Sequence, residues 1–225
     1  MVKVKICGIT NWIDARTSFE AGADFLGFNF YRKSPRYITP ASAARITKRL
    51  PRHVQAVGVF VNETEGKILA VARIVGLHQI QLHGDESPEA VVRLRREFPV
   101  IKAIKIRGKF KLSQLADFGK ADAYLLDTYH PDLPGGTGTA FDWNEIRRAG
   151  SRQKVFLAGG LTSENVAEAI QICRPYAVDV CSGTEARPGK KDARRTIAFM
   201  RGVRSSAKAG TKRAAKHRIV PRVRN

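Results

Sequence analysis

Short apolar segments recur along the chain at intervals of roughly 20 to 30 residues, and more polar segments separate them. The apolar segments are four to eight residues long and often β-branched, which is typical of β-strands. Several are apolar almost throughout, as in parallel strands that are buried on both faces. The predicted strands cover residues 2–7, 25–30, 54–61, 79–82, 100–106, 123–127, 155–158 and 176–180.

Helix signals occupy the segments between these strands. Thr39 and Ser87 each precede a proline, so each offers an N-cap hydroxyl followed by proline at the first helical position. Asn62 with Glu65, and Asp142 with Glu145, resemble capping boxes. The predicted helices cover residues 12–21, the segment that begins at 40, the segment after 62, and residues 89–98, 112–118, the segment after 142, 163–173 and 192–203.

Eight strands that alternate with eight helices predict parallel β-α-β units. We therefore expect a single α/β domain, a (β/α)₈ TIM barrel over residues 1–203, although a doubly wound open sheet remains an alternative. The 225 residues make this a compact barrel, since about 250 is typical. In such barrels the active site lies at the carboxyl ends of the strands.

Positive charge is concentrated at the end of the chain. The formal net charge is +20, and residues 201–225 contain nine Lys or Arg and no acidic residue. Residues 204–225 are therefore predicted to be a basic, disordered tail. An alternative function, a basic nucleic-acid-binding protein, rests on this charge, but the tail has no aromatic residue to stack on bases. We expect nucleic-acid contact, if any, only through the tail.

The three cysteines and the apolar runs exclude several classes of protein. Cys7, Cys173 and Cys181 have no zinc-type spacing and are odd in number, so neither a zinc site nor a disulfide framework is predicted. No apolar run approaches the roughly 20 residues that span a bilayer, and the N-terminus does not resemble a signal peptide. A cytoplasmic protein without a membrane partner is expected.

Six motifs lie at or just after the predicted strand ends. They are KICGIT from residue 5, SPR from 34, QLHG from 81, LLD from 125 followed by PGGTG from 134, LAGGL from 157 and DVCSGTE from 179. In this order and spacing the chain resembles the phosphoribosylanthranilate isomerases of tryptophan biosynthesis, from about residue 2 to residue 199. The resemblance implies an Amadori rearrangement of N-(5-phosphoribosyl)anthranilate to 1-(2-carboxyphenylamino)-1-deoxyribulose 5-phosphate. This reaction is redox-neutral and demands no cofactor.

The resemblance assigns the two proton-transfer roles to Cys7 as the base and Asp127 as the acid. A thiolate is the active form of Cys7, and a nearby cation is expected to lower its pKa. Without the resemblance, Cys7 would be interpreted as a small core residue, and Asp127 as a helix N-cap or a hydrogen-bond acceptor that orients a loop. Arg36 is expected to bind the substrate's carboxylate through its planar guanidinium. His83 and Asp179 are further candidates for substrate binding.

Glycine-rich segments are the candidates for phosphate binding, because glycine lets backbone N–H groups approach an anion closely. They follow the last three predicted strands and contribute Gly135, Gly136, Gly138, Gly159, Gly160, Ser182 and Gly183. Cys181 and Thr184 depart from the Ser and Val expected in the family. A related phosphate-binding-barrel isomerase of histidine biosynthesis is a second alternative, but such enzymes pair two aspartates where this chain has Cys7 at the first strand end. A monomer or a homodimer is expected.

Overall fold

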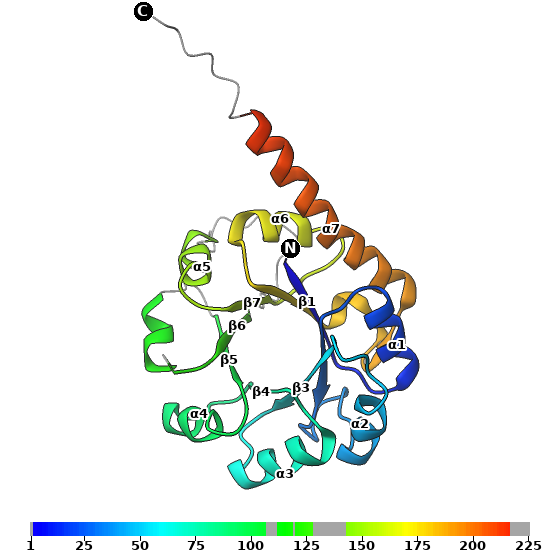
Figure 1. Ribbon diagram of the computed structural model, residues 1–225, viewed down its shortest axis with the longest axis vertical. Helices are drawn as coiled ribbons and strands as arrows, with labels where there is room; N and C mark the ends of the chain where they lie inside the picture. Colours follow the sequence, from blue (N-terminus) through cyan, green and yellow to red (C-terminus); the bar gives the residue numbers. More distant parts are fainter. Residues whose placement is uncertain (1, 107–111, 119, 128–142, 217–225) are drawn as a thin grey trace, which may run out of the picture.

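Eight parallel strands close into a barrel, and the helices form a ring around it (Figure 1). The computed structural model describes residues 2–106, 112–118, 120–127 and 143–216. Each strand pairs with the next in the sequence, and β8 pairs with β1 to complete the closure. The strands are β1 (Lys3–Cys7), β2 (Phe25–Asn29), β3 (Gln55–Phe60), β4 (Gln79–Leu82), β5 (Val100–Lys105), β6 (Ala123–Asp127), β7 (Val155–Ala158) and β8 (Ala177–Val180). The predicted (β/α)₈ barrel is confirmed, and the open sheet is excluded.

The helices follow the strands in the predicted order. They are α1 (Trp12–Glu20), α2 (Pro40–Thr47), α3 (Glu65–Val75), α4 (Pro88–Leu94), the 3₁₀ helix η1 (Leu112–Phe118), α5 (Trp143–Gly150), α6 (Val166–Cys173), the 3₁₀ helix η2 (Ser182–Thr184) and α7 (Ala193–Lys216). A small two-stranded sheet, β9 (Glu185–Arg187) with β10 (Lys190–Lys191), lies between η2 and α7. One of the eight expected helices, residues 112–118, is thus a 3₁₀ helix.

Polar side chains cap three of the described helices, the caps at Thr39 and Ser87 were predicted, and one predicted cap is wrong. The predicted cap at Asp142 lies outside the described residues. Asn11, Thr39 and Ser87 each accept a hydrogen bond from a backbone N–H in the first turn of α1, α2 and α4. The capping box at Asn62 does not form, because α3 begins after Thr64 and the Asn62 side chain accepts from the Asp85 N–H instead. Asn62 has a φ of 49°, which is a left-handed conformation that Asn tolerates better than most residues.

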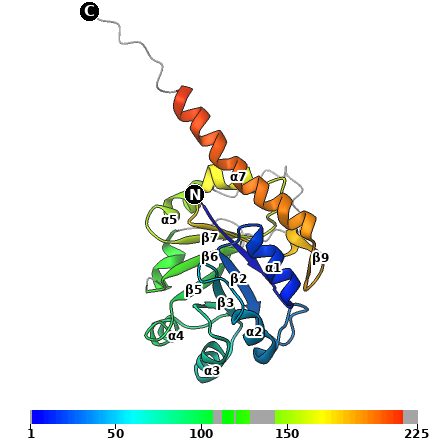
Figure 2. The same ribbon diagram turned by 45° about the vertical axis from the view of Figure 1, so that its right-hand side comes forward.

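The last helix is longer than the sequence pattern predicted. We expected it to end near residue 203, but α7 continues to Lys216 and its end projects away from the barrel (Figure 2). Ser206 is still buried, and Arg204 donates a hydrogen bond to the Ala21 carbonyl at 2.7 Å. The predicted helix end at residue 203 is therefore too early. Residues 217–225 lie outside the described part of the chain.

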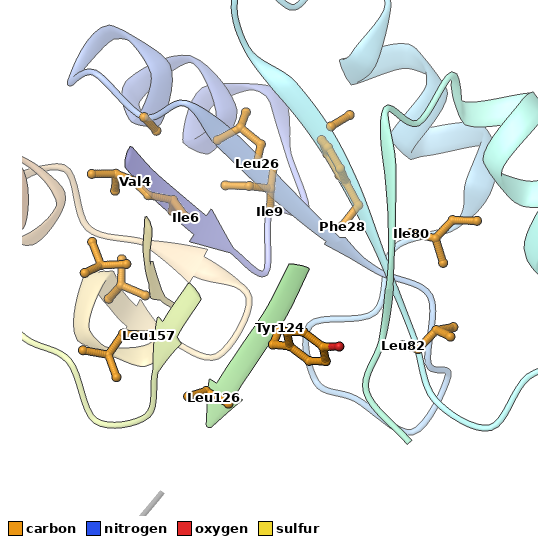
Figure 3. Packing of buried hydrophobic residues seen from close by; sticks show 14 of the residues in the cluster. Val4, Ile6, Ile9, Leu26, Phe28, Ile80, Leu82, Tyr124, Leu126 and Leu157 are labelled. Carbon is orange, nitrogen blue, oxygen red and sulfur yellow. The ribbon is translucent and has the colours of Figure 1, made fainter. Parts of the chain in front are cut away.

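Two separate apolar clusters stabilise the barrel. The larger cluster lies between strands and helices, and Figure 3 shows part of it, with side chains from β1, β2, β4, β6 and β7. The smaller one fills the barrel and includes Phe25, Val57, Leu125 and Phe156. Side chains alternate between the two sides of each strand. On β1, Val4 and Ile6 belong to the outer cluster, which turns Lys5 and Cys7 toward the barrel interior.

In the described residues no helix is both long and apolar enough to cross a membrane.

Candidate active site

A buried ion pair joins β1 and β8. Lys5 and Asp179 are register partners in these adjacent strands, and Lys5 Nζ lies 3.0 Å from Asp179 Oδ1. Lys5 has no exposed surface. Burial raises the pKa of Asp179 to about 6, although Lys5 opposes the rise. Burial also opposes the charge on Lys5, but Asp179 and Cys7 outweigh it and raise the pKa of the ammonium. Both groups are therefore charged at neutral pH.

Cys7 lies above this pair, two residues beyond Lys5 on the same strand. The pKa of Cys7 is well below the ordinary thiol value, because a hydrogen bond between the Cys7 and Cys181 sulfurs outweighs the cost of burial. The charges of Lys5 and Lys191 lower the pKa of Cys7 further. The thiolate is consequently the favoured form, which is the form that a base or nucleophile requires.

Asp127 ends β6 on another side of the barrel, where it faces His83. Asp127 Oδ2 lies 3.4 Å from His83 Nε2, and both side chains are about one-quarter exposed, at 26% and 24%. The other ring nitrogen, Nδ1, lies 2.9 Å from the amide nitrogen of buried Gln81. Donation by that amide places the imidazole proton on Nε2, directed at Asp127. His83 is also close enough to Cys7 and Asp179 to influence their pKa values. It therefore lies between Asp127 on β6 and the pair of strands β1 and β8.

The loop after β2 brings Arg36 to the same end of the barrel. Arg36 donates from Nε to Glu185 Oε1 at 2.9 Å and from Nη2 to Glu185 Oε2 at 2.7 Å. Glu185 is only 4% exposed and also accepts from the Gly189 N–H at 3.2 Å and from Lys191 Nζ at 3.4 Å. Burial alone would raise the pKa of Glu185, but Arg36 and Lys191 lower it overall. Glu185 therefore stays ionised and fixes the orientation of the guanidinium.

The loops after β7 and β8 contact each other closely. A Cβ atom on Gly183 would lie 2.1 Å from the Leu161 carbonyl oxygen, so only glycine fits there. Gly159 and Gly160 have φ values of 90° and 61°, in the left-handed region that favours glycine. Ser182 and Gly183 begin the short helix η2. Gly135, Gly136 and Gly138 lie outside the described residues.

The structure brings Cys7, Arg36, His83, Asp127 and Asp179 to the carboxyl ends of the strands. Sequence reasoning missed three further members of this site, and they are Lys5, Gln81 and Glu185. Lys5 and Gln81 could have been found as long polar side chains at alternate positions of otherwise apolar strands. Glu185 is the last residue of the DVCSGTE motif, but nothing in the sequence indicated its contact with Arg36, which joins residues 149 positions apart.

Comparison with known proteins gives a consistent result. The protein-family model described as N-(5'-phosphoribosyl)anthranilate isomerase matches residues 4–201 of this chain. The protein of that name from Trichlorobacter lovleyi is 49% identical over 207 residues, which cover 92% of this chain and 100% of the relative. The relative from Citrifermentans bemidjiense is 51% identical and covers 88% and 96% of the two chains.

Solved structures agree with this assignment. The crystal structure of phosphoribosyl anthranilate isomerase from Thermotoga maritima is 45% identical, has a TM-score of 0.82, and covers 91% of this chain and 100% of its own. A further structure, at 44% identity and a TM-score of 0.81, contains reduced 1-(o-carboxyphenylamino)-1-deoxyribulose 5-phosphate. The match along nearly the whole barrel shows that this chain belongs to the N-(5'-phosphoribosyl)anthranilate isomerase family.

Proposed function

We propose that this protein catalyses the Amadori rearrangement of N-(5-phosphoribosyl)anthranilate to 1-(2-carboxyphenylamino)-1-deoxyribulose 5-phosphate, a step of tryptophan biosynthesis. The observation that carries the proposal is a stabilised Cys7 thiolate at the same barrel end as the Asp127 carboxyl group, within a chain of this family. The reaction needs one group that gives a proton and one that takes a proton, and this end of the barrel offers both.

The first half of the reaction opens the furanose ring. Asp127, as the acid, donates a proton to the ring oxygen, and the anomeric nitrogen supplies the electrons that form a Schiff base. Asp127 stands at the end of a strand and is only partly exposed, so it can meet a substrate that enters from the barrel mouth. His83 holds the carboxyl group from one side.

The second half moves a proton from carbon. The Cys7 thiolate, as the base, removes the C2′ proton of the Schiff base, and the electron pair forms an enolamine. Transfer of a proton to C1′ and loss of the proton from the C2′ hydroxyl then give the ketone. Lys5, the Cys181 thiol and Lys191 favour the thiolate before the substrate arrives. No electrons are gained or lost overall.

Three contacts are proposed to hold the substrate. Arg36 binds the anthranilate carboxylate with donors that Glu185 leaves free, since a guanidinium has five N–H donors and Glu185 occupies Nε and one side of Nη2. Asp179 accepts hydrogen bonds from the ribulose hydroxyls. The backbone N–H groups around Gly159, Gly160, Ser182 and Gly183 bind the phosphate, together with Gly135, Gly136 and Gly138 of the preceding loop.

The partners proposed beyond the substrate are few. A relative from Thermotoga maritima is described as dimeric, with monomers generated from it. This chain is proposed to be a monomer or a homodimer in the cytoplasm, with nucleic-acid contact only through its basic end.

The test is direct incubation of the purified protein with freshly prepared N-(5-phosphoribosyl)anthranilate. The anthranilate-type fluorescence of the substrate is expected to decrease at a rate proportional to protein concentration. Cys7→Ala protein, shown to be folded by circular dichroism, is the control for a contaminating enzyme. An unchanged fluorescence with the wild-type protein would refute the function.

A further inference from the structure

Two thiols face each other across adjacent strands at the active site. The register pairs Lys5 with Asp179 and Ile6 with Val180, and Cys7 and Cys181 are the residues that directly follow the last of these pairs. Neighbouring strands lie about 4.8 Å apart, and disulfides form between Cα atoms about 4.4–6.8 Å apart. The two cysteines therefore follow directly on a pair of backbones whose separation lies in the range for a disulfide.

The two side chains are also in contact. A hydrogen bond joins the sulfurs of Cys7 and Cys181, and Cys181 Sγ also lies 3.7 Å from Glu185 Oε1. A Cβ atom on Gly8, the residue after Cys7, would lie 3.1 Å from Cys181 Sγ, which places that sulfur directly beside the β1 end. Both cysteines retain some exposed surface, so a small oxidant can reach them, whereas Cys173 is fully buried in α6.

We propose that Cys7 and Cys181 form a site of reversible oxidation, in which a peroxide oxidises Cys7 and Cys181 then closes a disulfide with it. The disulfide removes the base of the proposed reaction, so oxidation switches the enzyme off and a thiol reductant switches it on. The modification itself does not depend on the proposed function.

The chemistry takes place in two balanced steps. The Cys7 thiolate attacks one oxygen of hydrogen peroxide, the O–O bond breaks, and the products are a sulfenic acid and hydroxide. The Cys181 sulfur then attacks the Cys7 sulfur, the S–OH bond breaks, and the hydroxyl leaves as water with the thiol proton. Two thiols lose two electrons in total, and one peroxide gains them.

The neighbouring charges suit both steps. In the reduced protein, the hydrogen bond to Cys7 and burial raise the pKa of Cys181, so Cys7 is the thiolate that meets the peroxide first. Conversion of Cys7 to a neutral sulfenic acid removes the negative charge that keeps Cys181 protonated. Lys191 then favours the Cys181 thiolate, which is the form that attacks.

The experiment treats reduced protein with a few equivalents of hydrogen peroxide, blocks the remaining thiols with iodoacetamide, and measures intact mass and peptides. Wild-type protein is expected to lose about 2 Da before alkylation, because two thiols become one disulfide. It should then yield one linked pair of peptides, containing Cys7 and Cys181. Dithiothreitol is expected to reverse the mass change and to restore isomerase activity.

Two variants make the result specific. Cys181→Ser lacks the second thiol, so its Cys7 is expected to gain one or two oxygen atoms instead, and the doubly oxidised fraction will not recover with dithiothreitol. Cys173→Ala is expected to form the disulfide as wild type does. A wild-type protein in which Cys7 gains oxygen without a disulfide, or in which the linked peptides contain Cys173, would overturn the proposal. Because mass is the readout, these outcomes are decided even if the protein lacks isomerase activity.

Discussion

The pKa of Cys7 lies below that of an ordinary cysteine because the Cys181 thiol and the ammonium groups of Lys5 and Lys191 lie near its sulfur. The rate at which iodoacetamide alkylates Cys7 should rise with pH as the thiolate forms, and its midpoint should lie well below the roughly 8.5 of a free thiol. Lys5→Met is expected to move the midpoint to higher pH, since it removes one of the cations. Cys173 is the internal control, because burial raises its pKa to about 12 and keeps it unreactive. Alkylation of Cys7 with an ordinary thiol midpoint would contradict this electrostatic account.

The two proton-transfer roles predict large losses on substitution. Cys7→Ala and Asp127→Asn should each lower kcat by roughly 10²–10⁴-fold, which is the range for a general acid or base. Asp122→Asn is the matched control, since Asp122 lies at the opposite end of β6 and bonds the Val100 N–H and Arg95. Steady-state kinetics on folded variants checks the prediction. If a variant of Cys7 or Asp127 keeps more than about a tenth of the wild-type kcat, the role assigned to that residue is wrong.

Arg36 is expected to recognise the carboxylate of the substrate. Arg36→Met should weaken binding of the product by about 2–4 kcal/mol, because a charge-assisted bidentate contact is lost. An analogue without the carboxylate should bind wild type and variant about equally. Arg32→Met, at an exposed position of the same loop, is the control. Calorimetry with both ligands measures the difference, and a carboxylate preference that survives in Arg36→Met would place that group elsewhere.

At the scale of elements, the contact between the loops after β7 and β8 depends on Gly183. Gly183→Ala should cost about 1–3 kcal/mol of stability, as overpacking does, because its Cβ would overlap the Leu161 carbonyl. Displacement of that loop should also weaken its binding of the substrate's phosphate, and KM should rise as a result. Gly66→Ala in α3 is the control, because nothing lies within 4 Å of the added carbon and alanine favours a helix over glycine by roughly 0.5–1 kcal/mol. Thermal unfolding and KM values for both variants test the contrast, and an unchanged Tm for Gly183→Ala would refute it.

The strands were easier to predict than the helix ends. All eight strands agree with the apolar runs to within about two residues, since burial on both faces leaves a continuous apolar signal. Residues 112–118 form a 3₁₀ helix, which has no separate signal in the sequence. The cap at Asn62 was wrong because the side chain bonds to Asp85 of the next loop, a contact between residues 23 positions apart.

At the scale of the whole molecule, the contacts that the structure describes between α7 and the barrel reach as far as residue 206, while the basic residues continue to the end of the chain. Phe199, Met200 and Val203 are buried in the outer cluster, and Ser206 is the last buried residue that the structure describes. Residues 207–225 contain seven Lys or Arg and no acid.

Truncation after Ser206 should therefore leave kcat and Tm nearly unchanged. It should reduce retention on heparin, because each lost cation removes a contact with an anionic chain. A matched truncation after Phe199, which removes Met200, Val203 and the Arg204 contact with Ala21, should lower Tm. A large loss of activity or stability in the shorter truncation would show that residues 207–225 contribute to the barrel.

The sequence by itself determined the barrel, because the alternation of apolar runs and capped helices and the right-handed β-α-β connection leave few other arrangements. It also indicated Cys7, Arg36, His83, Asp127 and Asp179, since the carboxyl ends of parallel strands meet at one face. Only the tertiary structure decided what surrounds them. The Lys5–Asp179 pair, the Cys181 thiol beside Cys7 and the Glu185 carboxylate on Arg36 join residues more than 140 positions apart. Such contacts arise from closure of β8 onto β1, and that closure sets the proton affinity of Cys7.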